Sequence, residues 1–141
     1  MADRVNVDIV SPEKLVVSEQ ASAVSVPGSE GYFTVMGEHA ALLTTLRPGF
    51  VTVTAADGGA RAYYVEGGFA DVSALGLTIL ADSARAADEF EPAEIEAEMR
   101  RAQDAFDQAD SIEDKDAAQL LLDGWKNLML EAMHMDIGAA H

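Results

Sequence analysis

Histidine is the first residue type to consider for chemistry, because its side chain titrates near neutral pH and binds metal ions. The chain of 141 residues has three histidines, at positions 39, 134 and 141, and no cysteine. His39 has no second histidine near it in the sequence, so it lacks the partners that a metal site or a catalytic base requires. We expect it to pack and form hydrogen bonds within a loop. Without cysteine, the chain forms no disulfide, thiolate nucleophile or cysteine-ligated metal site.

The glycine-rich segments do not match a nucleotide-binding loop or a nucleophile turn. The segment GSEG at residues 28–31 lacks the G-x-S-x-G pattern of a serine nucleophile and is better explained as a tight turn. Neither the P-loop pattern nor G-x-G-x-x-G occurs in the chain. Asp71 and Asp82 could form a carboxylate pair, but solvation at the ends of strands explains both. We therefore predict no catalytic residue, no metal, no cofactor and no enzymatic activity.

Short apolar runs between turn residues dominate the first part of the chain. Val5, Val7 and Ile9 alternate with polar residues, the period of a half-buried strand. Nine of the 11 glycines precede residue 77, and they punctuate the later runs as turns do. This spacing predicts an antiparallel β-sandwich or barrel over residues 1–87, of which we take the sandwich as the predicted fold. Further strands are predicted at residues 15–17, 21–26, 32–35, 42–46, 50–54, 62–65, 69–72 and 77–81.

The last part of the chain has helical periodicity. Apolar residues recur on one face of a helix that Pro92 would begin, and again on a second helix, with the polar segment 107–114 between them. We predict an antiparallel two-helix hairpin over residues 88–141, with helices of about 16 and about 21 residues. The two predicted stripes are Ile95, Met99, Ala102 and Phe106, and Leu121, Trp125, Leu128, Ala132 and Met135.

Charge limits the range of partners. The formal net charge is −16, with 25 acidic residues against nine Lys and Arg. Residues 88–141 carry −11 of this charge. Nucleic acids and anionic lipids both require a basic surface, so neither is an expected partner. No apolar run approaches a membrane span, and the N-terminus lacks the pattern of a secretory signal. We expect a soluble, cytoplasmic protein without direct membrane insertion, whose apolar helical stripes favour an interaction protein.

Five segments of the first part, in this order and spacing, resemble the ε subunits of F-type ATP synthases. They are VSPEK at 10–14, VPGSEG at 26–31, the central segment 39–50, GGFADV at 67–72 and LTILA at 77–81. The resemblance implies a non-catalytic rotor subunit of the central stalk that binds the γ subunit and the membrane c-ring. It also implies indirect contact with the catalytic αβ head and a peripheral location on the cytoplasmic face of the bacterial inner membrane.

The same resemblance assigns c-ring contacts to loops at one end of the sandwich. On this chain the matching positions are Glu30, Tyr32 and His39, with Leu42 behind them. The sequence departs from the family pattern here. Gly37 and Ala41 replace common prolines, and Tyr32 stands where a carboxylate is often found.

Some family members bind ATP through an Ile/Leu-Asp-x-x-Arg-Ala motif and inhibit hydrolysis with an extended hairpin. Asp82, Arg85 and Ala86 match this motif, but they align with the end of the last predicted strand. The motif's expected place falls near residues 90–95, where Glu94 would repel phosphate. We therefore expect no ATP binding.

The same acidic character argues against inhibition by the hairpin. Residues 115–141 offer only Lys115 and Lys126 as cations, whereas inhibitory hairpins of the family use basic residues. We expect weak inhibition or none. Two alternatives stay open: an ATP-sensing regulatory subunit whose hairpin inhibits hydrolysis, and an unrelated enzyme or ligand-binding sandwich, which would need a polar pocket.

Overall fold

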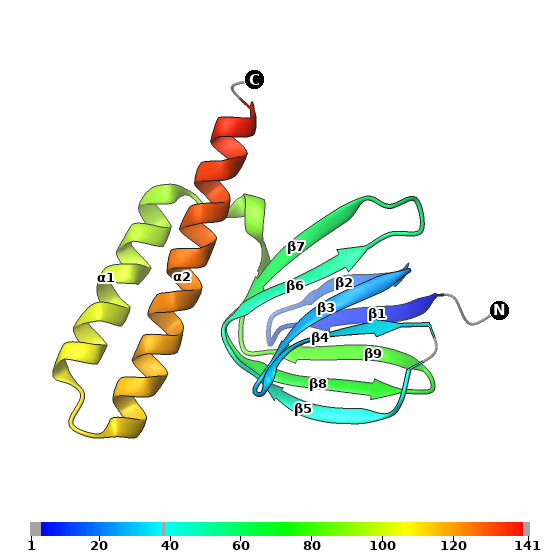
Figure 1. Ribbon diagram of the computed structural model, residues 1–141, viewed down its shortest axis with the longest axis horizontal. Coiled ribbons are helices and arrows are strands. Elements are labelled where there is room, and N and C mark those ends of the chain that lie inside the picture. The colour runs from blue at the N-terminus through cyan, green and yellow to red at the C-terminus, as the bar shows by residue number, and fades with distance from the viewer. Residues whose placement is uncertain (1–3, 38, 140–141) are drawn as a thin grey trace. The chain divides into compact units, whose positions relative to one another are not determined.

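The computed structural model describes residues 4–37 and 39–139 of the chain, with side chains up to residue 130 (Figure 1). The chain divides between Ala86 and Ala87 into two compact units. The first contains all the strands and the second contains the helices, and each is described by itself below.

Over its described residues the β unit has ten strands, and each of the nine predicted strands is confirmed within a few residues. β10 was not predicted, because a strand of three residues is too short to show a period. The strands are β1 (Val5–Val10), β2 (Leu15–Ala21), β3 (Ala23–Gly28), β4 (Gly31–Met36), β5 (Leu42–Leu46), β6 (Gly49–Thr54), β7 (Ala60–Val65), β8 (Gly68–Ser73), β9 (Gly76–Ala81) and β10 (Ala84–Ala86).

Alternation along the strands builds the core. Val5, Val7 and Ile9 of β1 are fully buried, whereas Asn6 between them is exposed. Successive side chains of a strand point to opposite faces, so this pattern places one face of the strand inward. Valine is the most frequent residue of the core, and its branched side chain suits a pleated surface. Other fully buried core residues are Ala21, Val24, Val26, Val51, Val65, Ala70 and Ile79.

The sheet folds over into two layers, which confirms the predicted sandwich (Figure 1). The order of hydrogen-bonded strands is β10-β7-β6-β3-β5-β8-β9-β1-β2, with β4 paired to β3 outside this path. β3 belongs to both layers: residues 23–25 pair with β6, and Gly28 pairs with Leu46 of β5. β4 pairs with the opposite side of β3 along its whole length. Among the described strands, only β3 pairs with β4, so β4 has a free edge.

One pairing differs from the predicted antiparallel arrangement. β1 and β9 are parallel, with Val7 opposite Leu77 and Ile9 opposite Ile79. Parallel neighbours cannot be joined by a hairpin, because the chain must cross over to return in the same direction. Here the whole of β2 to β8 forms that crossover. Sequence periodicity detects strands but not the direction of their neighbours, so this pairing was not predicted.

The helical unit is the predicted hairpin. After a short 3-10 turn (Ala87–Glu89), α1 (Pro92–Gln108) and α2 (Ile112–Ala139) pack against each other. Pro92 begins α1, and the Ser111 hydroxyl accepts a hydrogen bond from the Asp114 N–H at 3.0 Å, which caps α2. The connection is therefore only residues 109–111, and α2 is longer than predicted.

The predicted faces of the two helices are largely confirmed. Ile95 and Ala102 of α1 are buried, and so are Trp125 and Leu128 of α2. Leu122 rather than Leu121 takes the neighbouring buried position. The predicted stripe residues 132 and 135 lie outside the side chains that the structure describes. None of the described helices is both long and apolar enough to cross a bilayer.

Two glycines of the β unit provide a test of backbone constraint. Gly68 has φ +124°, and a Cβ there would clash with the carbonyl oxygen of Leu80. Gly58 has φ +93°, and a Cβ there would meet nothing within 4 Å. We expect Gly68→Ala to lower the free energy of unfolding by about 3 kcal/mol, from strain and overpacking together. Gly58→Ala, the control, should lower it by about 1 kcal/mol, from strain alone. Urea unfolding measures both; equal losses would contradict the clash.

Candidate functional site

A trough runs between the free edge of β4 and strand β5. It consists of two adjoining hollows of about 450 Å³ and about 290 Å³. Phe33 and Leu42 line both hollows, so the two adjoin and are described together as one feature with apolar and polar lining residues. We call it the β4–β5 trough. A groove with an apolar floor and a few polar groups at its border is the usual form of a binding site.

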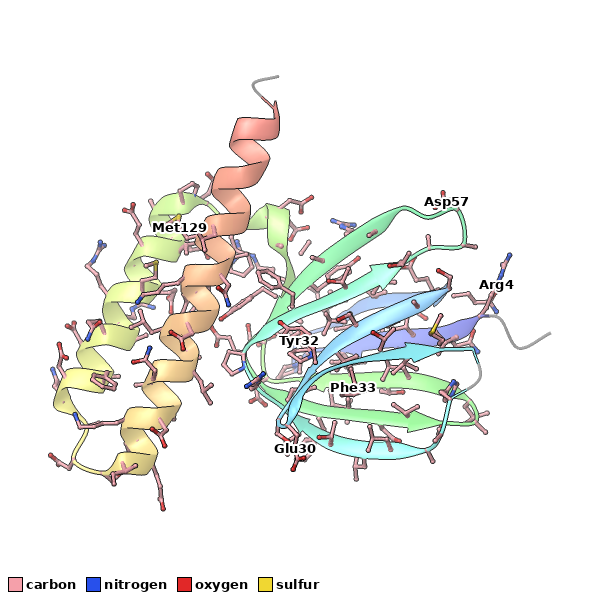
Figure 2. All side chains as sticks on the ribbon, viewed as in Figure 1. Arg4, Glu30, Tyr32, Phe33, Asp57 and Met129 are labelled. Atoms are coloured by element: carbon pink, nitrogen blue, oxygen red, sulfur yellow. The ribbon has the colours of Figure 1, made fainter. Side chains whose placement is uncertain are left out.

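The four predicted c-ring contacts all line this trough. Glu30 is exposed in the turn between β3 and β4, and Tyr32 follows on β4 (Figure 2). Leu42 begins β5, and His39 lies in the connection between β4 and β5. Glu30 and His39 are at opposite ends of β4, so the structure distributes the four residues along the trough rather than at one end of the sandwich. Their contact with a c-ring stays a prediction.

Tyr32 is held in a fixed position although its side chain is 53% exposed. Its hydroxyl accepts a hydrogen bond from the Phe50 N–H at 3.0 Å, which ties β4 to the start of β6. Gly49 makes this approach possible, because a Cβ there would lie 2.5 Å from the Tyr32 hydroxyl. A half-exposed aromatic ring with a fixed orientation is well suited to contact a partner, since little side-chain entropy remains to be lost on binding.

His39 forms the hydrogen bonds within its loop that the sequence led us to expect. Its Nδ1 lies 2.7 Å from the carbonyl oxygen of Met36, and its Nε2 lies 2.5 Å from that of Ser73. The Ser73 carbonyl, followed by the Met36 carbonyl, raises the pKa of His39 above 6.5, because both stabilise the protonated ring. His39 therefore connects the end of β4 to the turn between β8 and β9.

A second surface, which the sequence reasoning missed, lies on the outer face of the β5-β8-β9-β1-β2 layer. The strand register places Phe69 opposite Leu80, Leu80 opposite Val10, and Val10 opposite Leu15. These four residues form a line across four strands that we call the apolar row. Phe69 and Leu80 are each 50% exposed, and Leu15 is 59% exposed. A contiguous apolar surface of this kind marks an interaction site more often than scattered exposed residues do.

Carboxylates border the apolar row. In the neighbouring register row, Asp71 and Asp8 both lie opposite Thr78, and Asp82 is exposed just beyond the end of β9. The sequence signal was the uninterrupted apolar run at residues 79–81, since a strand with one solvated face should alternate. Leu77 and Ile79 face the core, so Leu80 must face outward. The sequence alone shows this apolar run, but only the strand register shows that Phe69 and Val10 lie beside Leu80.

The three residues of the ATP-motif candidate do not converge. Asp82 lies in the turn before β10, and its N–H donates to the Gly67 carbonyl at 3.0 Å. Arg85 and Ala86 are consecutive residues of β10, opposite Tyr64 and Tyr63 of β7. Consecutive strand residues face opposite ways, and Ala86 is buried in the core. The motif match therefore falls on a strand of the sandwich.

Tyr32→Phe tests whether the Tyr32 hydroxyl holds the ring in its position along the β4–β5 trough. The substitution removes the acceptor of the Phe50 N–H and should lower the free energy of unfolding by about 1 kcal/mol. Thr34→Val, two residues further along β4 and also exposed, is the control and should change stability by less than about 0.5 kcal/mol. Thermal or urea unfolding measures the difference. A Tyr32→Phe variant as stable as the wild type would show that the hydrogen bond does not hold the ring.

Comparisons with known proteins agree with the predicted resemblance. The family model "ATP synthase, Delta/Epsilon chain, beta-sandwich domain" matches residues 4–87. The ATP synthase epsilon chain of Brucella anthropi is 43% identical over 122 residues, which cover 86% of this chain and 90% of that protein. The epsilon chain of Brucella suis is 42% identical over the same length.

Solved structures give the same fold. A chain of the Euglena gracilis mitochondrial ATP synthase F1/c-ring structure aligns with a TM-score of 0.73 and 20% identity, covering 93% of this chain and 81% of that chain. A central stalk/c-ring chain of the Tetrahymena thermophila mitochondrial ATP synthase aligns with a TM-score of 0.57 and 18% identity, covering 88% and 95%. At these identities the structures support the fold, and the sequence matches establish the family. The chain belongs to the family of ATP synthase epsilon chains.

Proposed function

We propose that the chain is a non-catalytic central-stalk subunit of a proton-translocating ATP synthase, which links the γ subunit to the c-ring. In this role it couples proton-driven rotation of the ring to ATP synthesis. The observation that carries the proposal is the pair of exposed surfaces on the β unit, the apolar row and the β4–β5 trough. Contact with the αβ head is indirect, and the chain lies at the cytoplasmic face of the bacterial inner membrane, peripherally, through its partners.

The apolar row is the proposed γ surface. Phe69, Leu80 and Leu15 are each half exposed or more, and complete burial of such a side chain contributes roughly 1.5–3 kcal/mol. Docking of a partner at the row would therefore be favourable, because it removes these apolar side chains from water. Because Asp8, Asp71 and Asp82 border the row, the complementary surface is apolar with Lys or Arg at its rim. Such charges steer the encounter and fix the register of the docked proteins.

The β4–β5 trough is the proposed c-ring surface. Glu30 offers an exposed carboxylate at the β3–β4 turn, Tyr32 offers a fixed ring, and Leu42 contributes to the apolar floor. This combination fits a polar loop that carries a hydrogen-bond donor and one apolar side chain. The fixed Tyr32 ring takes the place of the carboxylate that relatives often carry, so the contact at this position is an aromatic one.

The construction of the sandwich suits a subunit that transmits torque. Side chains from both layers interdigitate in one core, and packed sheets resist sliding past each other. The two surfaces lie on the same β unit, so a force applied at the trough reaches the apolar row without passing through a flexible linker.

The hairpin is proposed to inhibit hydrolysis weakly or not at all. Its net charge is strongly negative, and the Lys115 ammonium donates to the Phe106 carbonyl at 3.2 Å and lies 4.6 Å from the centre of the Phe106 ring. This lysine therefore stabilises its own hairpin turn. Arg101 is paired with Glu98 on α1. Opposed like charges at an acidic partner would weaken binding.

The γ assignment is tested by placing a charge in the apolar row. We expect Phe69→Glu to reduce recovery of γ and the c-ring at least tenfold when the tagged full chain is isolated from membranes in mild detergent. Burial of an unpaired carboxylate costs several kcal/mol, which supports this size of effect. Gln20→Glu, an exposed position on β2 that pairs with Asn6, adds the same charge outside the row and should leave recovery unchanged. Equal recovery with both variants would remove the row from the interface.

The hairpin assignment is tested by deleting residues 88–141 in the assembled enzyme. ATP hydrolysis should change less than twofold, because the proposed inhibition by the acidic hairpin is weak or absent. A several-fold rise would instead support the ATP-sensing alternative. Calorimetric titration of the full chain with ATP then decides that alternative: we expect no heat of binding at millimolar ATP. Binding that Arg85→Ala abolishes would establish a nucleotide sensor.

A further inference from the structure

We propose that His39 is a positioning residue whose imidazolium form clamps the β4–β5 connection onto the β8–β9 turn. Loss of one ring proton removes one of the two hydrogen-bond donors, which loosens the connection and changes the shape of the adjacent end of the β4–β5 trough. The chain thus carries a proton-operated clamp within its β unit.

The two hydrogen bonds of the ring define the protonation state. Nδ1 is 2.7 Å from the Met36 carbonyl oxygen, and Nε2 is 2.5 Å from the Ser73 carbonyl oxygen. A carbonyl oxygen only accepts hydrogen bonds, so each ring nitrogen must donate. A neutral imidazole has one N–H and one lone pair, whereas the imidazolium has two N–H groups. Only the protonated ring therefore satisfies both contacts; in either neutral tautomer a lone pair would face a carbonyl oxygen.

The two acceptors belong to segments far apart in the sequence. Met36 ends β4, and Ser73, 34 residues after His39, ends β8. The β8–β9 turn is itself anchored: the Leu75 N–H donates to the Ser73 hydroxyl at 3.2 Å, and the Asn6 amide donates to the Leu75 carbonyl at 3.4 Å. The ring thus holds a connection that lies outside the strands against a turn that is fixed to β1.

The clamp borders the trough directly. His39, Ala40 and Leu42 line its hollow of about 290 Å³, so a shift of the connection moves one wall of that hollow. The other described residues of β4, β5 and β8 that line this hollow carry no charge: Phe33, Thr34, Val35, Met36, Leu42 and Val72. Among the described residues, no charged side chain contributes to the raised pKa of His39. Glu38, the neighbour in sequence, lies outside the described residues. Among the groups that face the ring, backbone carbonyl dipoles therefore supply the stabilisation of the cation.

The direction of the pH dependence follows from the raised pKa of His39. A group whose pKa is higher in the folded protein than in the unfolded chain stabilises the fold fully below the unfolded value, near 6.5. That contribution disappears as the pH rises through the folded-state pKa. The clamp is therefore closed at mildly acidic pH and open at alkaline pH.

Nuclear magnetic resonance on the ¹⁵N-histidine-labelled full chain tests the clamp, with His39→Gln identifying the His39 signals. We expect both ring nitrogens of His39 to be protonated at pH 6, and the ring to titrate above pH 6.5. A single neutral tautomer at pH 6, or titration at or below 6.5, would overturn the proposal. Because this experiment uses the isolated chain, its outcome is independent of the rotor assignment.

Hydrogen exchange gives a second measurement, whose pH dependence would be absent if His39 had only a structural role. After correction for the intrinsic pH dependence, the amides of residues 37, 39–41 and 73–75 should lose at least threefold protection in the wild type as the pH rises through the His39 midpoint. His39→Gln should show the low protection at every pH. His39→Arg, a cation that stays charged, should show no step over the same range. A step that persists in His39→Gln would assign the transition to another group and refute the clamp.

Discussion

The parallel pairing of β1 with β9 is the contact on which the β unit depends. It joins the first strand of the chain to the ninth and makes one layer of β5-β8-β9 and β1-β2, which would otherwise be two separate groups of strands. Gly76 permits the close approach, because a Cβ there would clash with the Asn6 carbonyl oxygen. One of the two exposed surfaces, the apolar row, follows from this closure. The apolar row is continuous only because Leu80 and Val10 become neighbours across the parallel pair.

The same closure explains why the free chain presents apolar side chains. A two-layer sandwich buries one face of each sheet, and the other face is free to vary without loss of the core. Phe69, Leu80 and Leu15 add nothing to the core that the inward-facing valines form, so the stability of the β unit does not explain their clustering on the outer face. The free edge of β4 similarly leaves backbone groups that a covered or closed sheet would satisfy internally. The β unit is therefore built as one component of an assembly.

The helical unit follows simpler rules, and the sequence predicted it more completely. Its stripes repeat at helical spacing, and Pro92 and Ser111 mark the two helix starts by local chemistry. The length of the connection was overestimated, because the polar residues at 107 and 108 continue α1 and suggested a loop by composition alone. The lysine at position 115 also has a tertiary role that its sequence neighbours do not reveal, since its acceptor at Phe106 belongs to the other helix.

The sequence by itself determined nine strands, two helices, the sandwich and the family. Alternation, turn residues and helical spacing are local properties, and five segments in fixed order carry the resemblance. Only the tertiary structure decided which strands are neighbours, and in which direction. Strand register depends on contacts between residues some 70 positions apart, such as Val10 and Leu80, and no local pattern encodes them. The apolar row, the position of Glu30 and His39 along one trough, and the two carbonyl partners of His39 all required that long-range pairing.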